Sequence, residues 1–255
     1  YNIVDSYFVA QISEQAMTAL SLVYPLQLLE TAIAVGFGIG MNAAAAYYLG
    51  AKEQQRADDI VTSGLILSLL HGVILMAAAL LFAPAFVSLF TENEKILAEG
   101  VKYSNLVFIF AVPNVIAITF EKIFQAEGRM KVSMLSMLCG CVANIILDPL
   151  LIFGIGIFPK MGIEGAAIAT GIGQVIPLIV YLFIFIKHPV SLHFHWHEKV
   201  FQKRLMGQMY GVGIPATLNL ALPSFMITAL NGILAVYSAS YVLVLGIYYK
   251  LQTFI

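Results

Sequence analysis

Long stretches without a single charged side chain dominate this chain. Six runs contain no Asp, Glu, Lys or Arg: residues 31–51, 60–91, 103–120, 132–147, 165–186 and 205–249. A membrane-spanning helix needs about 20 mostly apolar residues, and these runs approach or exceed that length. Only 11% of the residues are charged, whereas soluble domains carry roughly 25%. The sequence therefore predicts an all-α integral membrane protein.

Charges and turn residues divide the chain into eight expected helices. The run 205–249 is too long for one span, and we place a turn at Tyr237–Ser240. The helices are expected at 1–10, 18–49, 60–84, 101–125, 131–153, 165–187, 205–236 and 240–255. The second would be about 48 Å long, should tilt or protrude, and should stop at Gly50. Because the chain begins and ends inside apolar stretches, we expect a piece of a longer protein.

Basic residues are unequally distributed between the loops on the two sides. One side carries Lys52, Arg56, Arg129, Lys131, Lys187, Lys199, Lys203 and Arg204, and the other carries Lys95, Lys102 and Lys160. The positive-inside rule predicts that loops 50–58, 126–131 and 188–204 are cytoplasmic. The net charge of −1 indicates no basic surface for nucleic acid.

A weak internal repeat relates the two ends of the chain. Shifting the sequence by 225 residues places "YPLQ" (24–27) on "YKLQ" (249–252). The match joins the first two expected helices to the last two in the same direction, as in parallel repeats. It predicts a parent protein of about 450 residues with twelve helices, of which about eight are present here.

Acidic residues inside the spans are the first candidates for function. A charge at the bilayer centre costs ~2.5–3.5 kcal/mol, so such residues are functional by default. Asp148 has Asn144 on its helix face at i−4, and Pro149 removes the helical partner of the Ile145 carbonyl. We expect these oxygens to hold Na⁺ or a proton-linked hydrogen-bond network. A structural role for Asp148, or for Asp5 in the first helix, remains the alternative.

Other polar residues in the spans are candidates for a substrate cavity: Gln27, Glu30, Asn42, Gln174 and Gln252. Thr170 shares a helix face with Gln174, but hydrogen bonding between helices explains it equally well. For Gln27 and Glu30, a purely structural role is at least as well supported. The position of Lys250 in the last helix fits snorkelling, pairing or a cavity lining, and the sequence does not decide among them.

Several motifs predict packing rather than chemistry. "GFGIG" (36–40) follows no strand, so it indicates close helix packing instead of a dinucleotide loop. Cys139 and Cys141 point in different directions on a helix and form no expected pair. The only histidine within a span, His71, has no acid at helical spacing, which argues against a membrane-embedded enzyme.

The segment "HFHWH" places three histidines on one side of an extended strand: His193, His195 and His197. Imidazoles in this arrangement could bind a metal ion. No cysteine or carboxylate partner set in the sequence completes a site, so we expect no metal here.

Longer motifs resemble a known family of transporters. They are "YNIVDSYFVAQIS", "GFGIGMNAAAAYYLGAKEQQRA", "QAEGRMKVSM", "NIILDPLLIFG", "MGIEGAAIATGIGQ", "GIPATLNLALPS" and "LNGILAVYSASYVLVLGIYYKLQTF". The chain resembles the MATE (multidrug and toxic compound extrusion) family over essentially its whole length. Residues 205–236 contain no acid, which resembles the DinF-type branch.

The resemblance implies an architecture of two six-helix lobes. Residues 1–187 would form the N-lobe, 188–204 a cytoplasmic connector, and 205–255 the start of the C-lobe. The whole protein would lie in the cell (inner or plasma) membrane and be monomeric. It would be no enzyme and need no cofactor.

The resemblance also implies the activity. The protein would export cationic or amphiphilic drugs by antiport with H⁺ or Na⁺, and Asp5, Asn144, Asp148 and Thr170 would form the coupling site. A low-dielectric environment favours the protonated carboxyl, which suits proton coupling. The choice between H⁺ and Na⁺ and the identity of the drug stay open.

Two rival transport functions remain. A lipid-linked precursor flippase of the same superfamily would need a more cationic cavity, and a passive channel would not move drugs against a gradient.

Overall fold

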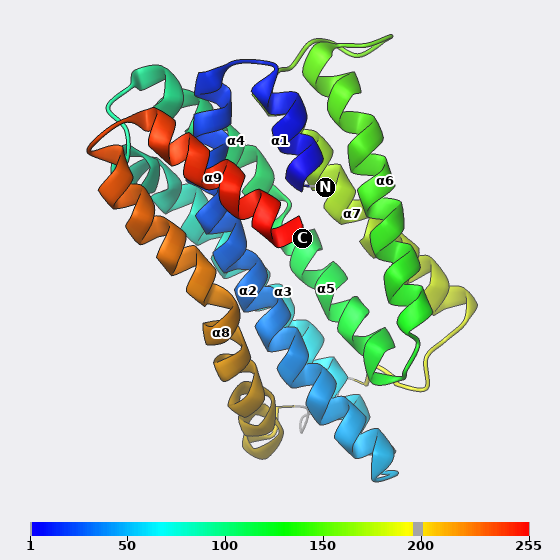
Figure 1. Cartoon of the computed structure of the whole chain (residues 1–255). Coiled ribbons are helices and arrows are strands. Elements are labelled where there is room, and N and C mark those ends of the chain that lie inside the picture. The colour runs from blue at the N-terminus through cyan, green and yellow to red at the C-terminus, as the bar shows by residue number, and fades with distance from the viewer. Residues whose placement is uncertain (1, 196–200, 255) are drawn as a thin grey trace.

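The computed structural model describes residues 2–195 and 201–254, and its regular structure within these ranges is helical throughout. The helices are α1 (Asn2–Ala10), α2 (Glu14–Gly50), α3 (Gln54–Ser88), α4 (Glu94–Ile109), α5 (Ala111–Ala126), α6 (Met130–Phe153), α7 (Ile163–Lys187), α8 (Lys203–Ala235) and α9 (Ala239–Phe254). They form an elongated bundle (Figure 1). The predicted all-α fold class is confirmed.

Membrane-spanning character is concentrated in the long helices. Among the described residues, five helices are long and apolar enough to cross a bilayer: α2, α3, α6, α7 and α8. The pair α4 and α5 adds a sixth span if the two count as one bent segment. Many large apolar side chains on the outside of the bundle are exposed, among them Leu81, Phe82, Ile186 and Leu222. Exposed apolar side chains of this kind are typical of a helix bundle that sits in lipid.

The expected single helix over 101–125 is wrong. The structure has two helices, which begin at Glu94 and Ala111 and meet at Phe110 with a bend of 46°. Pro113 has no N–H, so it cannot donate to the Ile109 carbonyl, and this loss weakens the helix at that point. The ring of Phe110 packs where Gly171 of α7 has no Cβ. The Phe110 ring at the bend therefore occupies the space that a side chain at position 171 of α7 would fill.

Several other boundaries agree with the sequence signals, although α3 (Gln54–Ser88) is longer at both ends than the expected helix 60–84. Helix α2 ends at Gly50, and α8 and α9 meet at residues 236–238, within one residue of the expected turn. Helix α2 starts earlier than expected because Ser13 caps it, with the Ser13 Oγ accepting a hydrogen bond of 3.0 Å from the Ala16 amide. Such caps satisfy the free amides of a first helical turn.

Helix α2 runs through the middle of the bundle and packs closely on α8 (Figure 1). The "GFGIG" motif makes this possible. A Cβ on Gly36 would collide with Thr217, and one on Gly40 with the Met209 carbonyl of α8. The prediction of close helix packing is confirmed.

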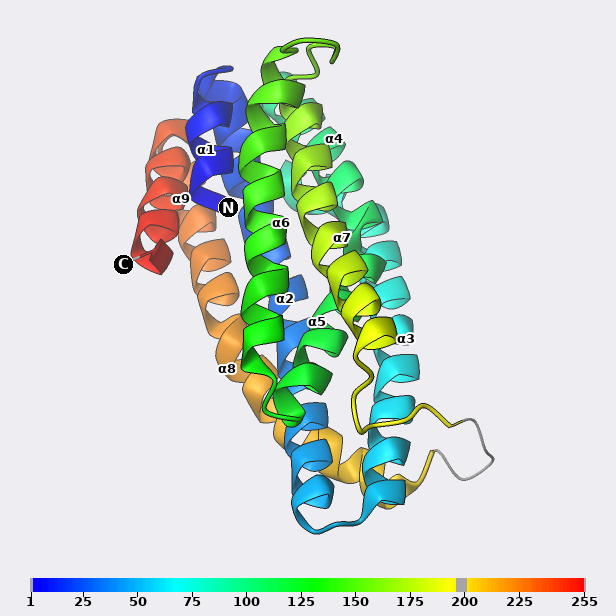
Figure 2. The same cartoon turned by 90° about the vertical axis from the view of Figure 1, so that its right-hand side faces the viewer.

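The three loops predicted to be cytoplasmic lie at the same end of the bundle (Figures 1 and 2). Arg129 Nη1 donates to the His188 carbonyl at 2.8 Å. The Glu127 carboxylate accepts hydrogen bonds from the Ser191 hydroxyl (2.7 Å) and the Leu192 amide (3.0 Å). These bonds tie loop 126–131 to the connector. The basic residues counted on this side thus share one end, apart from Lys199, which lies outside the described residues.

Candidate functional site

Four polar residues predicted for ion coupling come together in the interior of the bundle. Asp5 lies on α1, Asn144 and Asp148 on α6, and Thr170 on α7, and all four side chains are buried. Asn144 Nδ2 donates to Asp5 Oδ1 at 3.1 Å and to Asp148 Oδ1 at 3.4 Å. Thr170 Oγ1 donates to Asp5 Oδ2 at 3.0 Å. We call this group the carboxylate cluster.

Glycines bring α6 and α7 close enough for the cluster to form. A Cβ on Gly140 would collide with the Gly173 carbonyl and the Pro177 ring. A Cβ on Gly173 would lie 3.0 Å from the Cβ of Asn144. Small residues at such contacts let helix backbones approach in a membrane. Asn144 is therefore held against α7, where it can reach α1.

Two buried oxygens of the cluster have no hydrogen-bond partner: Asn144 Oδ1 and Asp148 Oδ2. An unpaired buried polar atom costs about 1–3 kcal/mol, so such atoms require an explanation. Carboxylate and amide oxygens are ligands for hard cations and acceptors for protons. Helix α6 continues through Pro149, and the part of the Ile145 carbonyl in the site stays a prediction.

Lys250 of α9 reaches the edge of the carboxylate cluster. Its side chain is only 5% exposed. Its Nζ donates to the Ser6 hydroxyl at 2.8 Å and lies 5.1 Å from the centre of the Tyr24 ring. Of the three roles left open by the sequence, the contacts favour pairing with polar groups next to Asp5.

A small cavity of about 40 Å³ adjoins the cluster, and Gln27, Glu30, Thr170 and Gln174 are among the residues that line it. Glu30 is buried and accepts a hydrogen bond of 3.0 Å from Asn114 Nδ2. Gln174 Oε1 is buried without a partner. Three of the five predicted cavity residues therefore lie together beside Thr170.

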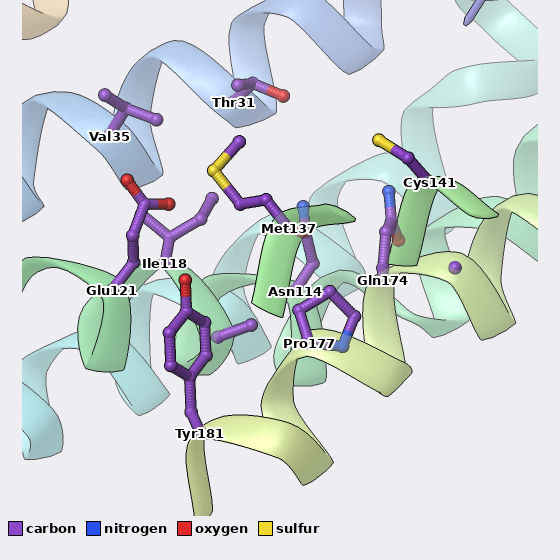
Figure 3. Close-up of a pocket in the computed structure, with 12 residues that line it drawn as sticks. Thr31, Val35, Asn114, Ile118, Glu121, Met137, Cys141, Gln174, Pro177 and Tyr181 are labelled. Atoms are coloured by element: carbon purple, nitrogen blue, oxygen red, sulfur yellow. The ribbon is translucent and has the colours of Figure 1, made fainter. Parts of the chain in front are cut away.

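A larger cavity of about 180 Å³ lies among α2, α5, α6 and α7 (Figure 3). Its wall is mostly apolar, and Gln174 belongs to both cavities. Asn114, Glu121 and Tyr181 add polar atoms that sequence reasoning did not assign to a site. Glu121 accepts from Lys122 Nζ at 3.0 Å and from Gln125 Nε2 at 2.7 Å. The sequence feature that could have pointed to Glu121 is its position directly after the charge-free run 103–120.

Two predicted cavity residues lie elsewhere. Asn42 Nδ2 donates to the Lys122 carbonyl at 2.8 Å and joins α2 to α5. Gln252 is exposed on α9. Neither residue lines the two cavities, so their assignment to the substrate site has no support in the geometry.

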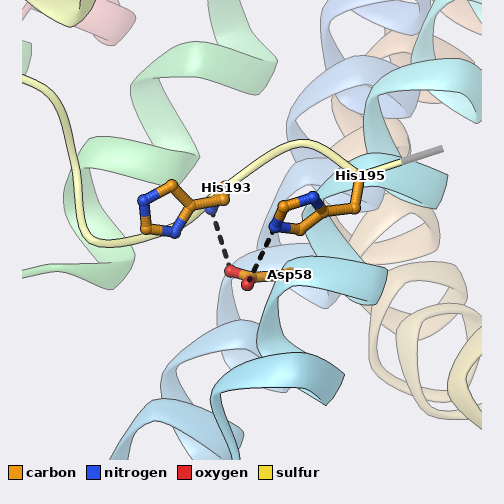
Figure 4. Close-up of side chains that lie close together, drawn as sticks. All are labelled: Asp58, His193 and His195. Atoms are coloured by element: carbon orange, nitrogen blue, oxygen red, sulfur yellow. Dashed lines mark hydrogen bonds and ion pairs between the residues drawn. The ribbon is translucent and has the colours of Figure 1, made fainter.

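The histidines of the connector have a carboxylate neighbour that the sequence did not reveal, and the expectation that no metal binds here stays a prediction. Asp58, His193 and His195 each offer a ligand atom, and these atoms lie within 4.8 Å of one another (Figure 4). The third histidine, His197, lies outside the described residues. Cys139 and Cys141 are free, as predicted.

Comparison with known proteins decides the family. The MatE family model matches residues 1–150 of the chain. The chain belongs to the MatE family. Its members are membrane transporters rather than enzymes, and they are multi-pass proteins of the plasma membrane.

This chain is similar in sequence to individual MatE relatives over most or all of its length. The multidrug export protein MepA of Staphylococcus aureus (strain MRSA252) is 27% identical over all 255 residues, which cover 56% of that protein. An FAD transporter of Shewanella oneidensis is 30% identical over 190 residues, covering 74% of this chain and 42% of that protein.

A solved structure shows the same arrangement. It is the inward-facing conformation of a multidrug resistance MATE family transporter of the MOP superfamily, with a TM-score of 0.90 and 25% identity. The match covers all of this chain and 57% of the solved chain. The MatE chain therefore spans little more than half the length of the proteins it resembles.

Proposed function

We propose that this chain is the part of a secondary active multidrug exporter that holds the ion-coupling site. The exporter moves cationic or amphiphilic compounds out of the cell in exchange for H⁺ or Na⁺. The carboxylate cluster carries the proposal, because Asn144 links two buried carboxylates and two oxygens of the cluster lack partners.

The chemistry of coupling follows from charge. Two carboxylates in a low-dielectric interior repel each other, so the site favours uptake of one proton or one Na⁺. Uptake from outside removes one of the two negative charges, relieves the repulsion between the carboxylates and allows α1, α6 and α7 to rearrange. The rearranged lobe binds the drug more weakly, and release of the ion inside restores the drug site. The gradient drives the cycle because ion and drug bind the two states with different affinities.

The larger cavity is the proposed site for part of the drug. Its 180 Å³ is below the roughly 300–1,000 Å³ typical of drug sites. The remainder of the site would come from the C-lobe, of which 205–255 is the proposed start after the connector 188–204. An apolar wall with Glu121 suits an amphiphile with a positive charge.

An anionic cargo is the second candidate, because one relative is an FAD transporter and lipid-linked flippases carry pyrophosphate. Glu121, which pairs with Lys122, lines the larger cavity and Glu30 the smaller one, and the described residues lining either cavity include no Lys or Arg. A like charge in the wall disfavours an anion by electrostatic repulsion. The cavities therefore favour cationic over anionic cargo.

The test uses the full-length parent protein in proteoliposomes with an imposed pH or Na⁺ gradient and ethidium as the cargo. Asp148→Asn should abolish gradient-driven uphill transport. The control is Asp59→Asn, because Asp59 is also a buried acid but lies on α3 beside the connector; this variant should transport as the wild type does. The gradient that drives the wild type identifies the ion. Wild-type uphill transport by Asp148→Asn would sink the proposal.

A further inference from the structure

The connector between the proposed lobes crosses the first turns of α3. There, Asp58 of α3 faces the side chains of His193 and His195 (Figure 4). The Asp58 side chain is buried, whereas both histidines are exposed. The site shares no residue with the carboxylate cluster and takes no part in the proposed coupling.

Hydrogen bonds fix the Asp58 carboxylate in place. Its Oδ1 accepts from Gln54 Nε2 and from the His193 amide, both at 2.9 Å. Its Oδ2 points to the His195 ring, with 3.9 Å between Oδ2 and Nε2. Asp58 Oδ2 is therefore the oxygen turned toward the His195 ring.

The backbone of the connector orients the two imidazoles. The His195 amide donates to Thr62 Oγ1 at 3.2 Å, so the segment is tied to α3 at both histidines. Residues two apart on an extended segment point to the same side. The two rings lie 6.0 Å apart, centre to centre, and are inclined by 30°. Both rings can thus approach the one carboxylate.

We propose that Asp58, His193 and His195 bind a divalent transition-metal cation, with Zn²⁺ as the expected ion. Two imidazole nitrogens and one carboxylate oxygen are a common zinc ligand set, with water at the fourth position. Imidazole ligands favour Zn²⁺, Ni²⁺ or Cu²⁺ over Mg²⁺ and Ca²⁺. Tetrahedral ligands at zinc distances lie about 3.4 Å apart, so rotation of the exposed histidine side chains brings them to the fixed carboxylate.

A bound metal would connect α3 to the connector at three side chains. The competing explanation is that Asp58 only holds the connector through its hydrogen bonds, with no ion involved. That explanation predicts no selective metal binding, and the two can be separated because Asp58→Asn keeps the Oδ1 acceptor while losing the charge.

The test measures Zn²⁺ binding to the full-length protein, after removal of any histidine tag, by competition with a chromogenic chelator. One high-affinity Zn²⁺ per chain is expected, and MgCl₂ in excess should not displace it. His195→Ala and Asp58→Asn should each weaken binding by about tenfold or more. His188→Ala is the matched control, because this exposed connector histidine makes its hydrogen bonds through the backbone: its N–H donates to the Ile184 carbonyl and its carbonyl accepts from Arg129.

Cobalt provides a second readout that loss of folding would not mimic. Co²⁺ bound to the wild type should give the visible absorption of a tetrahedral site, and His193→Ala should abolish or shift it while the melting temperature without metal stays unchanged. Wild-type Zn²⁺ binding weaker than about 100 µM, or equal binding by wild type and all three ligand variants, would overturn the proposal. Neither result bears on Asp148→Asn transport, so the two proposals fail separately.

Discussion

Asn144 donates a hydrogen bond of 3.1 Å from its Nδ2 to Asp5 Oδ1, across 139 positions of sequence. The same nitrogen reaches Asp148 at 3.4 Å. One amide group therefore sets the separation of two carboxylates that come from different helices. Any change in their ionisation acts directly on the contact between α1 and α6.

Loss of this amide should destabilise the protein in a pH-dependent way. Asn144→Ala leaves buried carboxylate oxygens without their donor, at a cost of about 1–3 kcal/mol in the free energy of unfolding. The deficit should be largest while both carboxyls are charged and should shrink as pH falls, because a protonated carboxyl supplies the missing donor. Thermal unfolding in detergent across pH measures it.

The control for this variant is Asn42→Ala, which also removes one interhelical amide bond, to the Lys122 carbonyl. No carboxyl is involved there, so its deficit should not vary with pH. Parallel pH curves for the two variants would contradict the role given to Asn144.

Lys250 should weaken cation binding at the neighbouring cluster. Its ammonium group is held on Ser6, the residue next to Asp5, and a fixed positive charge repels an incoming cation. Lys250→Met should lower the Na⁺ or proton concentration for half-maximal drug export about three- to tenfold. Lys250→Arg keeps the charge and should stay near wild type; a loss of affinity in Lys250→Met would refute this account.

Glu121 and Lys122 should affect cationic drugs in opposite directions. Glu121→Gln removes the acid from the wall of the larger cavity and should weaken binding of an organic cation about tenfold, as expected for loss of a partly buried ion pair. Lys122→Met frees Glu121 from its ion pair at 3.0 Å and should strengthen that binding. Equilibrium binding of ethidium and of an uncharged amphiphile would check this, with the uncharged compound unaffected.

The glycine contacts between α2 and α8 should tolerate no added methyl group. In Gly40→Ala, the new Cβ would collide with the Met209 carbonyl, and such overpacking costs about 1–3 kcal/mol. Gly50→Ala is the control, because nothing lies within 4 Å of a Cβ at that position. Melting temperatures of the two variants should differ by several degrees, and equal values would show that the helices can separate freely.

Much of the fold could be predicted because lipid imposes simple rules. Charge-free runs marked the spans, and Gly50 and the turn near Tyr237 marked ends where local backbone chemistry acts. The break at Phe110 could not be predicted from Pro113 alone. Other prolines lie inside unbroken helices: Pro25, Pro84, Pro149, Pro177, Pro215 and Pro223. The helix breaks near Pro113 and not at the other prolines because of packing between helices, where the Phe110 ring meets Gly171.

For the candidate sites, too, contacts within one helix could be predicted from the sequence, whereas contacts between distant segments could not. Helical spacing placed Asn144 and Asp148 on one face of a helix, and the cost of buried charge singled out Asp5. The cavity role of Glu121 depends on which way α5 turns, which its sequence does not reveal. In the sequence, Asp58 is one acid in a polar stretch expected to be a loop, and its meeting with His193 spans 135 positions. Only the path of the connector brings them together.

Helix α2 belongs to the proposed first lobe and α8 to the second, yet their backbones meet at Gly40 and Gly213. Side chains are absent from this contact, so no rotamer change can widen or narrow it. If the lobes change their relative orientation during transport, rotation about this backbone contact would keep the two helices packed, and the contact would act as a fulcrum. The ends of the two helices would then move the most, while residues at the height of Gly40 would keep the same neighbours in both states.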